Sequence, residues 1–539
     1  MKLILKNKML AGTFWMSFGS IFSRVLGVLY LIPWLLMFGS QSNQYAAQAL
    51  FNSAYNAYAL FLALGTSGFP TAISRKIAIY NSENRFYDSR HLFKAALVFM
   101  TISGLICGGL FYFFAPLIAA HSPVSDTQAA SLTIRALVPA LVILPVMSVI
   151  RGWFQGNQDL KPFGISQLFE QLARIVFIML MTYLSFNLLH LSLAVAVAWS
   201  TFAAFVGAVV SLIYLWRYYQ QKRSFYQQQL QVSRPAGNLK IKQLFWQIIQ
   251  EALPFVYVGS GITLGQLIDQ FTFKSIMQHS TSFDLTKIQN LFTLFSANPT
   301  KITTVIISLA IAMSGTTLPL LASAQTDHQK AAAVIQDNFR MLFGLLAPIT
   351  IILALLAGQI NTIFFGYNAH GGWLLFWSIL MTFIQAVFTD VFTMVQSLGK
   401  HRLAVILLTI TLILKLILQY PLVYFFHDYG ALLATALAFA VTMGYCLQYL
   451  MNYSQIQRFS QFADLGLLTK VNLLFALAVT LLLAALKWLP LGVGRLDCLI
   501  FSIIFGVPAL LLYLGLAYWY GLPQIVLKLN WKKKSYKHF

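Results

Sequence analysis

Long apolar runs restrict the fold of this 539-residue chain more than any other feature of its sequence. About fourteen runs reach 18 residues or more, the length that a helix needs to cross about 30 Å of hydrocarbon. Their centres lie near Val25, Leu60, Ile106, Leu144, Ile175, Ala203, Gly259, Leu309, Ile351, Thr382, Ile413, Leu437, Ala478 and Val507. A bilayer leaves no backbone polar group to water, so spans of this length must be helical. We predict an all-α polytopic membrane protein.

The composition agrees with this class. Hydrophobic residues make up 59% of the chain and charged residues only 9%, against about 25% in soluble proteins. The net charge of +22 does not indicate a nucleic-acid partner, because the basic residues gather at the ends of apolar runs. The basic N-terminus precedes a run that is too long for a signal peptide, so a retained first span is expected. The three cysteines lack metal-binding spacing.

The positions of Lys and Arg predict the orientation, because cytoplasmic loops are rich in them. Alternate connections hold nearly all of these residues, and the others hold almost none, with Lys487 and Arg495 as exceptions. The basic connections include Arg75, Lys76, Arg85, Arg90 and Lys94, then Arg151 and Lys161, then Arg217 to Lys242, and finally the tail from Lys528 to Lys537. We therefore predict an even number of spans with both termini in the cytoplasm.

The longest polar break, about 217–243, separates two sets of six predicted spans, and a last pair follows. Pro-x-x-x-Ser after a Ser-Gly pair occurs near the end of the second span, at 67–74, and again at the end of the eighth, at 314–323. This echo predicts a parallel repeat with its pseudo-two-fold axis along the membrane normal and a central site. The predicted domains are an N-terminal lobe (1–236), a C-terminal lobe (237–456) and two further helices with a basic tail (457–539).

Arg24 lies in the interior of the first apolar run, roughly 20 Å along the helix. An arginine at mid-bilayer costs about 2.5–3.5 kcal/mol, so it should face a wet cavity or an anionic partner. Lining a polar cavity and packing against a carboxylate are both compatible with this position.

Glu170 and Arg174 lie four residues apart in the favourable order and share one helical face with Gln167. They can line a cavity or form a self-neutralising stripe between helices. Lys301 occupies the repeat-symmetric span and is a second candidate for the cavity, and Arg75 a third, although topology alone also explains a cation there.

Two carboxylates need partners inside the predicted spans. Asp269 can neutralise an empty cationic cavity, bind a coupling ion, or pair with Lys274 or Lys301. Asp390 and Lys415 favour a structural pair between the tenth and eleventh spans.

The chain has no Walker A pattern, no His-Glu-x-x-His and no large polar domain, so a transporter is expected rather than an enzyme. No catalytic residue, no metal and no cofactor are predicted, and a coupling ion or the membrane potential would drive transport. The Gln-rich segment 218–231 is either an ordinary basic connection or an amphipathic surface helix.

Four motifs carry a resemblance to a known family: 23–27 (SRVLG), 68–75 (GFPTAISR), 151–156 (RGWFQG) and 165–174 (ISQLFEQLAR). They resemble the polysaccharide-biosynthesis branch of the multidrug/oligosaccharidyl-lipid/polysaccharide flippase superfamily. The nearest groups are the lipid II flippases of YtgP (MurJ-like) type and the stage V sporulation protein B group.

The resemblance implies two six-helix lobes in the bacterial cell membrane, working by alternating access around a cationic cavity. It implies that an undecaprenyl-pyrophosphate-linked peptidoglycan precursor moves from the inner to the outer leaflet, and that the last two helices form a groove for the lipid tail. The substrate-binding candidates are Arg24, Arg75, Gln167, Glu170, Arg174 and Lys301, with Asp269 for ion coupling or charge balance. Membrane lipids and cell-wall synthesis proteins are candidate partners.

Three other functions remain open at this point. The chain could carry another lipid-linked glycan, such as a teichoic acid or capsule unit, or export drugs on the same scaffold. A drug exporter should hold acidic residues for cationic substrates, whereas the first-half candidates are mainly basic. A membrane glycan polymerase usually needs a large outer loop, and the predicted outer loops are short.

Overall fold

The computed structural model describes residues 15, 18–19, 22–66, 68–234, 241–324, 327–453, 464–486, 488 and 492–526. These ranges are almost wholly helical and contain no strand, which confirms the all-α prediction. Eleven helices within them are long and apolar enough to cross a membrane, and a shorter apolar helix covers Phe22–Leu36. The basic tail, Ser67 of the first repeat motif and Lys487 lie outside the described residues.

Two features account for the higher number of predicted spans. Helix α19 (His401–Tyr453) is interrupted at His427, whose φ of 53° and ψ of −124° are not helical, so it contains the two spans predicted around Ile413 and Leu437. The span predicted around Gly259 corresponds to α11 (Ile241–Gly259) and α12 (Gly261–Ser280), which meet at Ser260.

The chain divides into two compact units, Met1–Thr293 and Leu294–Phe539. The predicted division into two six-helix lobes and a final pair stays a prediction. The remaining labelled elements of the first unit are α2 (Leu31–Leu36), α3 (Gln41–Thr66), α4 (Phe69–Ser82), α5 (Phe86–His121), α6 (Thr127–Arg135), α7 (Val138–Gly156), α8 (Lys161–Thr182), the π-helical turn η1 (Tyr183–Leu188), α9 (Leu193–Gln221), α10 (Arg223–Gln231) and α13 (Leu285–Phe292).

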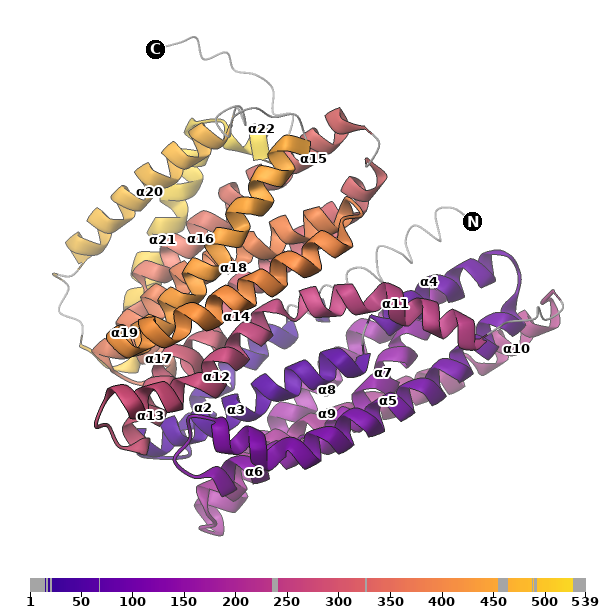
Figure 1. Cartoon of the computed structure of the whole chain (residues 1–539), viewed down its shortest axis with the longest axis horizontal. Helices are drawn as coiled ribbons and strands as arrows, with labels where there is room; N and C mark the ends of the chain where they lie inside the picture. Colours follow the sequence, from indigo (N-terminus) through magenta and orange to yellow (C-terminus); the bar gives the residue numbers. More distant parts are fainter. Residues whose placement is uncertain are drawn as a thin grey trace. The chain divides into compact units, whose positions relative to one another are not determined.

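The first unit is a bundle in which α8 packs on α9, and α7 packs on α4, α5 and α9 (Figure 1). Its core contains hydrogen bonds between helices: the buried Trp34 indole donates to the hydroxyls of Thr182 (3.2 Å) and Ser200 (3.1 Å). These bonds fix α2 against α8 and α9. The Gln-rich segment 218–231 is helical: it contains the last residues of α9 and the helix α10, which packs on α5 and α9.

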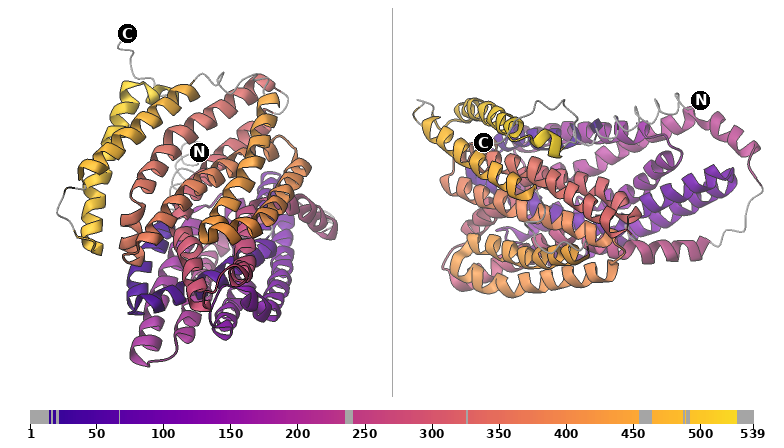
Figure 2. Two further views of the ribbon diagram at one scale, coloured as in Figure 1. Left: turned by 60° about the vertical axis from the view of Figure 1, so that its left-hand side comes forward. Right: turned by 90° about the horizontal axis from the view of Figure 1, so that it is seen from above.

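The second unit contains η2 (Thr293–Ala297) at its start, α14 (Asn298–Ser323), α15 (His328–Met341), η3 (Leu342–Leu346), α16 (Ala347–Leu355), α17 (Ala357–Phe365), α18 (Ala369–Ser397), α19, α20 (Leu465–Leu486), α21 (Arg495–Trp519) and α22 (Leu522–Val526). Helix α18 is its centre and packs on α14, α16, α17 and α19. Helices α20 and α21 contact each other, and they are the yellow-orange and yellow helices in Figure 2.

Candidate functional site

Three charged side chains meet inside the first unit, at the packing of α7, α8 and α9. One carboxylate oxygen of Glu170 lies 2.9 Å from Nη2 of Arg151, and the other lies 3.7 Å from Nη2 of Arg174. The three side chains are only 11%, 17% and 21% exposed for Arg151, Glu170 and Arg174. We call this set the arginine–glutamate cluster.

The local sequence explains this geometry. Glu170 and Arg174 are one helical turn apart on α8, and Gly207 lets α9 approach, since a Cβ there would lie 2.6 Å from the Glu170 carbonyl. Arg151 reaches the cluster from α7. Its guanidinium also donates to the hydroxyls of Ser166 (2.8 Å) and Ser211 (3.1 Å), so both its Nε and its Nη2 are hydrogen-bonded to protein groups.

Arg174 is less completely neutralised than Arg151. Its contact with Glu170 is long, and its Nε is buried with no hydrogen-bond partner in the described part of the chain. Three tyrosines lie near it: Tyr30, Tyr55 and Tyr58. With two guanidinium groups and one carboxylate, the cluster carries a formal charge of +1. A guanidinium with spare donors is suited to bind phosphate oxygens.

The other first-unit candidates lie apart from these contacts. Gln167 is one turn before Glu170 on α8, and its Oε1 is buried without a hydrogen-bond partner among the described residues. Arg24 and Arg75 are exposed, and neither forms an ion pair with another described residue. The predicted grouping of Glu170, Arg174 and Gln167 on one face of a helix is therefore observed, while the roles of all these residues stay predictions.

The acidic candidates have different surroundings. Asp269 is buried on α12, and Lys274 donates to the Ala120 carbonyl (3.3 Å), so the proposed pair of these two residues is not observed. In the second unit, Asp390 accepts from Ser314 (2.6 Å) and Asn338 (3.1 Å).

Lys301 and Lys415 of the second unit both lie on helices that are long and apolar enough to cross a membrane. Lys415 is fully buried and donates to Thr435, so the structure contradicts the predicted structural pair of Asp390 with Lys415. Asp390 accepts hydrogen bonds from a serine hydroxyl and an asparagine amide, and Lys415 donates to a threonine hydroxyl. Lys301 is partly buried on α14.

Sequence reasoning missed Arg151 as a member of the cluster. Its place at the end of an apolar run suggested a topological cation, and nothing in the spacing indicated that it turns inward to Glu170, 19 residues later. Tyr30, Tyr55 and Tyr58 are uncharged, so a search for charged residues in the apolar runs could not identify them. Within the described residues, no group of three or more His, Cys, Asp or Glu side chains could hold a metal ion.

Comparison with known proteins gives one consistent family. The family model described as polysaccharide biosynthesis protein matches residues 9–325. The lipid II flippase MurJ of Bacillus subtilis (strain 168) is 31% identical over 453 residues, which are 82% of this chain and 82% of that protein. Stage V sporulation protein B of the same organism is 26% identical over 249 residues, 46% of each chain.

Solved structures agree on the fold. A lipid II flippase MurJ in an inward closed conformation superposes with a TM-score of 0.64 at 15% identity, covering 94% of this chain and 98% of that one. An inward-facing MATE family multidrug transporter gives a TM-score of 0.60 at 16% identity, covering 81% and 96%. The predicted MATE-like transporter fold is confirmed.

Proposed function

Because the chain belongs to the polysaccharide biosynthesis protein family, we propose that it is a flippase that moves lipid II, a prenyl-pyrophosphate-linked peptidoglycan precursor, from the inner to the outer leaflet. The observation that carries this proposal is the 31% identity to a lipid II flippase over 82% of both chains. No catalytic step is needed, since the headgroup only has to cross the hydrocarbon.

The chemistry of the first unit supports an anionic headgroup. A sugar-pyrophosphate cannot cross hydrocarbon unaided because its charges and hydroxyls would lose their water. A cavity lined by guanidinium and amide groups replaces that water while the prenyl tail stays in lipid. Arg174 provides the partly neutralised guanidinium, Gln167 a nearby amide, and Glu170 holds the charge of Arg174 in place.

The exposed cations complete the proposed path of the pyrophosphate. Arg24 and Arg75 are free of described ion-pair partners, so their donors are available to phosphate oxygens. We assign to Lys301 a further point charge for the substrate, and to Asp269 the balance of the cations when no substrate is bound. These roles rest on the charges of the residues, on the exposure of Arg24 and Arg75, and on the family membership.

We further propose that the protein lies in the bacterial cell membrane with both termini in the cytoplasm. The alternation of basic and non-basic connections supports this orientation. The repeat motif supports two six-helix lobes, and the family resemblance supports a lipid-tail groove formed by the last two helices. Cell-wall synthesis enzymes are the expected partners that supply and use the precursor.

The first test is precursor externalisation in cells that depend on this protein. We expect Arg24→Ala, at matched membrane abundance, to reduce the outward appearance of lipid II by at least tenfold, because a phosphate-binding guanidinium is lost. Arg135→Ala is the matched control. It also removes an exposed guanidinium from the first unit, but Arg135 lies over the Tyr112 ring (4.6 Å) and has no proposed substrate role.

Two results would contradict parts of this proposal. Full activity of Arg24→Ala would make Arg24 a packing residue. Normal lipid II externalisation after depletion of the whole protein would exclude lipid II as the required substrate and favour another lipid-linked glycan. A multidrug antiporter is the weaker alternative, because a cluster of formal charge +1 repels the cationic compounds that such transporters export.

A further inference from the structure

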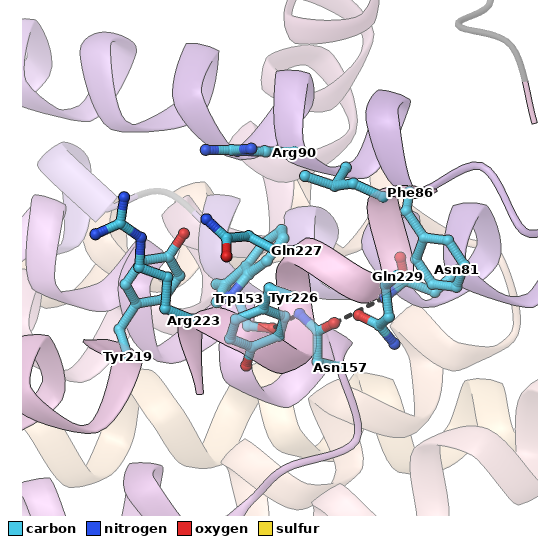
Figure 3. Close-up of a pocket in the computed structure, with 11 residues that line it drawn as sticks. Asn81, Phe86, Arg90, Trp153, Asn157, Tyr219, Arg223, Tyr226, Gln227 and Gln229 are labelled. Atoms are coloured by element: carbon cyan, nitrogen blue, oxygen red, sulfur yellow. Dashed lines mark hydrogen bonds between the residues drawn. The ribbon is translucent and has the colours of Figure 1, made fainter. Parts of the chain in front are cut away.

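A pocket of about 70 Å³ lies in the first unit, where the ends of α4, α7 and α9 and the start of α5 meet α10 (Figure 3). This volume holds several water molecules and so suits a small polar group. Its lining residue Trp153 follows Arg151 of the arginine–glutamate cluster by two residues on α7, but no residue of the cluster lines the pocket. The pocket lies at the end of the unit that the basic connections place in the cytoplasm.

The pocket is built by ring packing and backbone bonds that do not depend on a ligand. Tyr226 of α10 is buried, stacks on Tyr219 with centroids 5.5 Å apart, and contacts the Trp153 ring at 5.6 Å. The segment after α10 is tied to the α4–α5 turn, where the Arg234 amide donates to the Asn84 carbonyl (2.8 Å). The Tyr87 amide donates to the Ser233 hydroxyl (3.2 Å), which closes the same corner.

Two guanidinium groups line this pocket without a compensating carboxylate. Arg90 and Arg223 are exposed and form no ion pair with a described residue, and no acidic side chain lines the pocket. The nearby acids are already engaged: Glu83 and Asp88 bind Arg85 at 3.2 and 2.7 Å, and Asp159 accepts from the Tyr218 hydroxyl at 2.7 Å. The pKa of Arg85 is raised, mainly by its hydrogen bond to Asp88, so this local pairing is firm.

Apart from Leu230, the rest of the lining is polar or aromatic. In the view of Figure 3, Gln227 lies between Arg90 and the Trp153–Tyr226 pair, and Arg223 lies beside Tyr219. Asn157 accepts from Asn81 (3.0 Å), and the Asn81 Oδ1 is buried with no hydrogen-bond partner among the described residues. Burial also raises the pKa of Tyr226, so its hydroxyl stays protonated and can donate.

We infer that this pocket is a second, non-transport site that binds a phosphate-bearing ligand. Two uncompensated arginines provide the paired donors that phosphate oxygens accept. The aromatic rings and side-chain amides provide stacking and hydrogen bonds for a polar body attached to the phosphate. Since α10 holds the pocket closed against α5 and α9, ligand binding would stabilise that packing. The inference does not depend on which lipid the protein transports.

The ligand has two sources of the same chemistry: a free phosphorylated metabolite or the headgroup of an anionic phospholipid. The test uses purified full-length protein in a neutral detergent without phosphate, with inorganic pyrophosphate as the probe of the first source. Nanodiscs of phosphatidylcholine, with or without phosphatidylglycerol, probe the second. The readouts are the thermal unfolding midpoint and direct binding of radiolabelled pyrophosphate.

We expect a saturable stabilisation that weakens about tenfold in apparent affinity in Arg90→Gln and in Arg223→Gln, because each loses charge-assisted hydrogen bonds. Lys222→Gln is the matched control, since it removes the neighbouring charge but does not line the pocket. Stabilisation by pyrophosphate indicates a free metabolite, and stabilisation by phosphatidylglycerol alone indicates a lipid headgroup.

The transport cavity could also bind pyrophosphate, so Arg24→Ala is included and should retain the response. A response lost in Arg24→Ala but kept in Arg223→Gln would overturn the inference. The inference would also be overturned if Arg223→Gln and Lys222→Gln weakened ligand binding equally, or if neither pyrophosphate nor phosphatidylglycerol stabilised the protein. If Arg90→Gln alone lowers stability without ligand, the binding measurement on Arg223→Gln decides the question.

Discussion

At the scale of single residues, the arginine–glutamate cluster shows how a membrane protein keeps cations away from water. Glu170 contacts two arginines with its two oxygens, so removing its charge leaves both guanidinium groups without a carboxylate. An uncompensated charge inside a protein costs several kcal/mol, and breaking a buried pair typically costs 3–5 kcal/mol. Glu170 is therefore expected to be a stabilising residue as well as part of the proposed site.

We predict that Glu170→Gln lowers the free energy of unfolding in detergent by about 3 kcal/mol, since the cluster is largely buried. Glu83→Gln is the control, because it makes the same change in a glutamate that pairs with Arg85 but is 46% exposed. The control should cost less than about 1 kcal/mol. Similar losses for both variants would show that the cluster contributes no more than a surface ion pair.

Asp390 is a carboxylate that is held by neutral donors. Its Oδ1 accepts from Ser314 and Asn338, and Ser314 has a second acceptor in the Ala310 carbonyl. Asp390→Asn preserves an acceptor oxygen for both donors, so we expect nearly native stability. Asp390→Leu leaves the Asn338 amide unpaired and should cost about 1–3 kcal/mol. Thermal unfolding of the two variants distinguishes them, and equal midpoints would contradict this account.

The sequence predicted part of this residue-scale picture. Spacing of four residues on a helix was enough to place Glu170, Arg174 and Gln167 on one face. It could not identify Arg151, because contacts between different helices depend on how those helices pack. It also paired Asp390 with Lys415 on charge alone, whereas in the structure Asp390 accepts from a hydroxyl and an amide and Lys415 donates to the Thr435 hydroxyl.

At the scale of helices, glycine determines how closely α4 and α7 pack. A Cβ at Gly152 would lie 2.8 Å from the Pro70 carbonyl oxygen, which is too close for any real contact. The motifs around these two residues were singled out in the sequence for their resemblance to a family. Their close approach in the structure gives those motifs a packing reason.

We predict that Gly152→Ala separates α4 from α7 and lowers the free energy of unfolding by about 1–3 kcal/mol. Gly109→Ala in α5 is the control, because nothing lies within 4 Å of a Cβ at that position. In a helix, that change should be neutral or stabilising by up to about 1 kcal/mol. A Gly152→Ala protein as stable as the control would mean that the helices shift apart without cost.

Helix type was predictable from run length, and so were the two spans around Ile413 and Leu437. The break of α19 at His427 lies between them, but apolar composition does not show that it consists of one non-helical backbone conformation. For the segment 218–231, composition allowed both an ordinary basic connection and an amphipathic surface helix. The packing of Tyr226 against α9 and Trp153 selects the helix, and such contacts are invisible in one sequence.

At the scale of the whole molecule, the distribution of charge bears on the driving force. An anion that moves outward from a negative interior gains about 2.3 kcal/mol per charge for each 100 mV. A cationic binding site without substrate would be drawn back toward the inside by the same potential. Both steps of a flipping cycle would then run downhill, with no need for an ion gradient or nucleotide hydrolysis.

We therefore predict that lipid II externalisation falls severalfold when valinomycin and high external potassium collapse the membrane potential, at unchanged protein abundance. Nigericin is the control, because it removes the pH gradient while leaving the potential. If nigericin stopped transport and valinomycin did not, a proton gradient would drive the cycle, and a titratable carboxylate such as Asp269 or Asp390 would have to carry the coupling. Sensitivity to valinomycin alone would instead assign the driving force to the net positive charge of the substrate site.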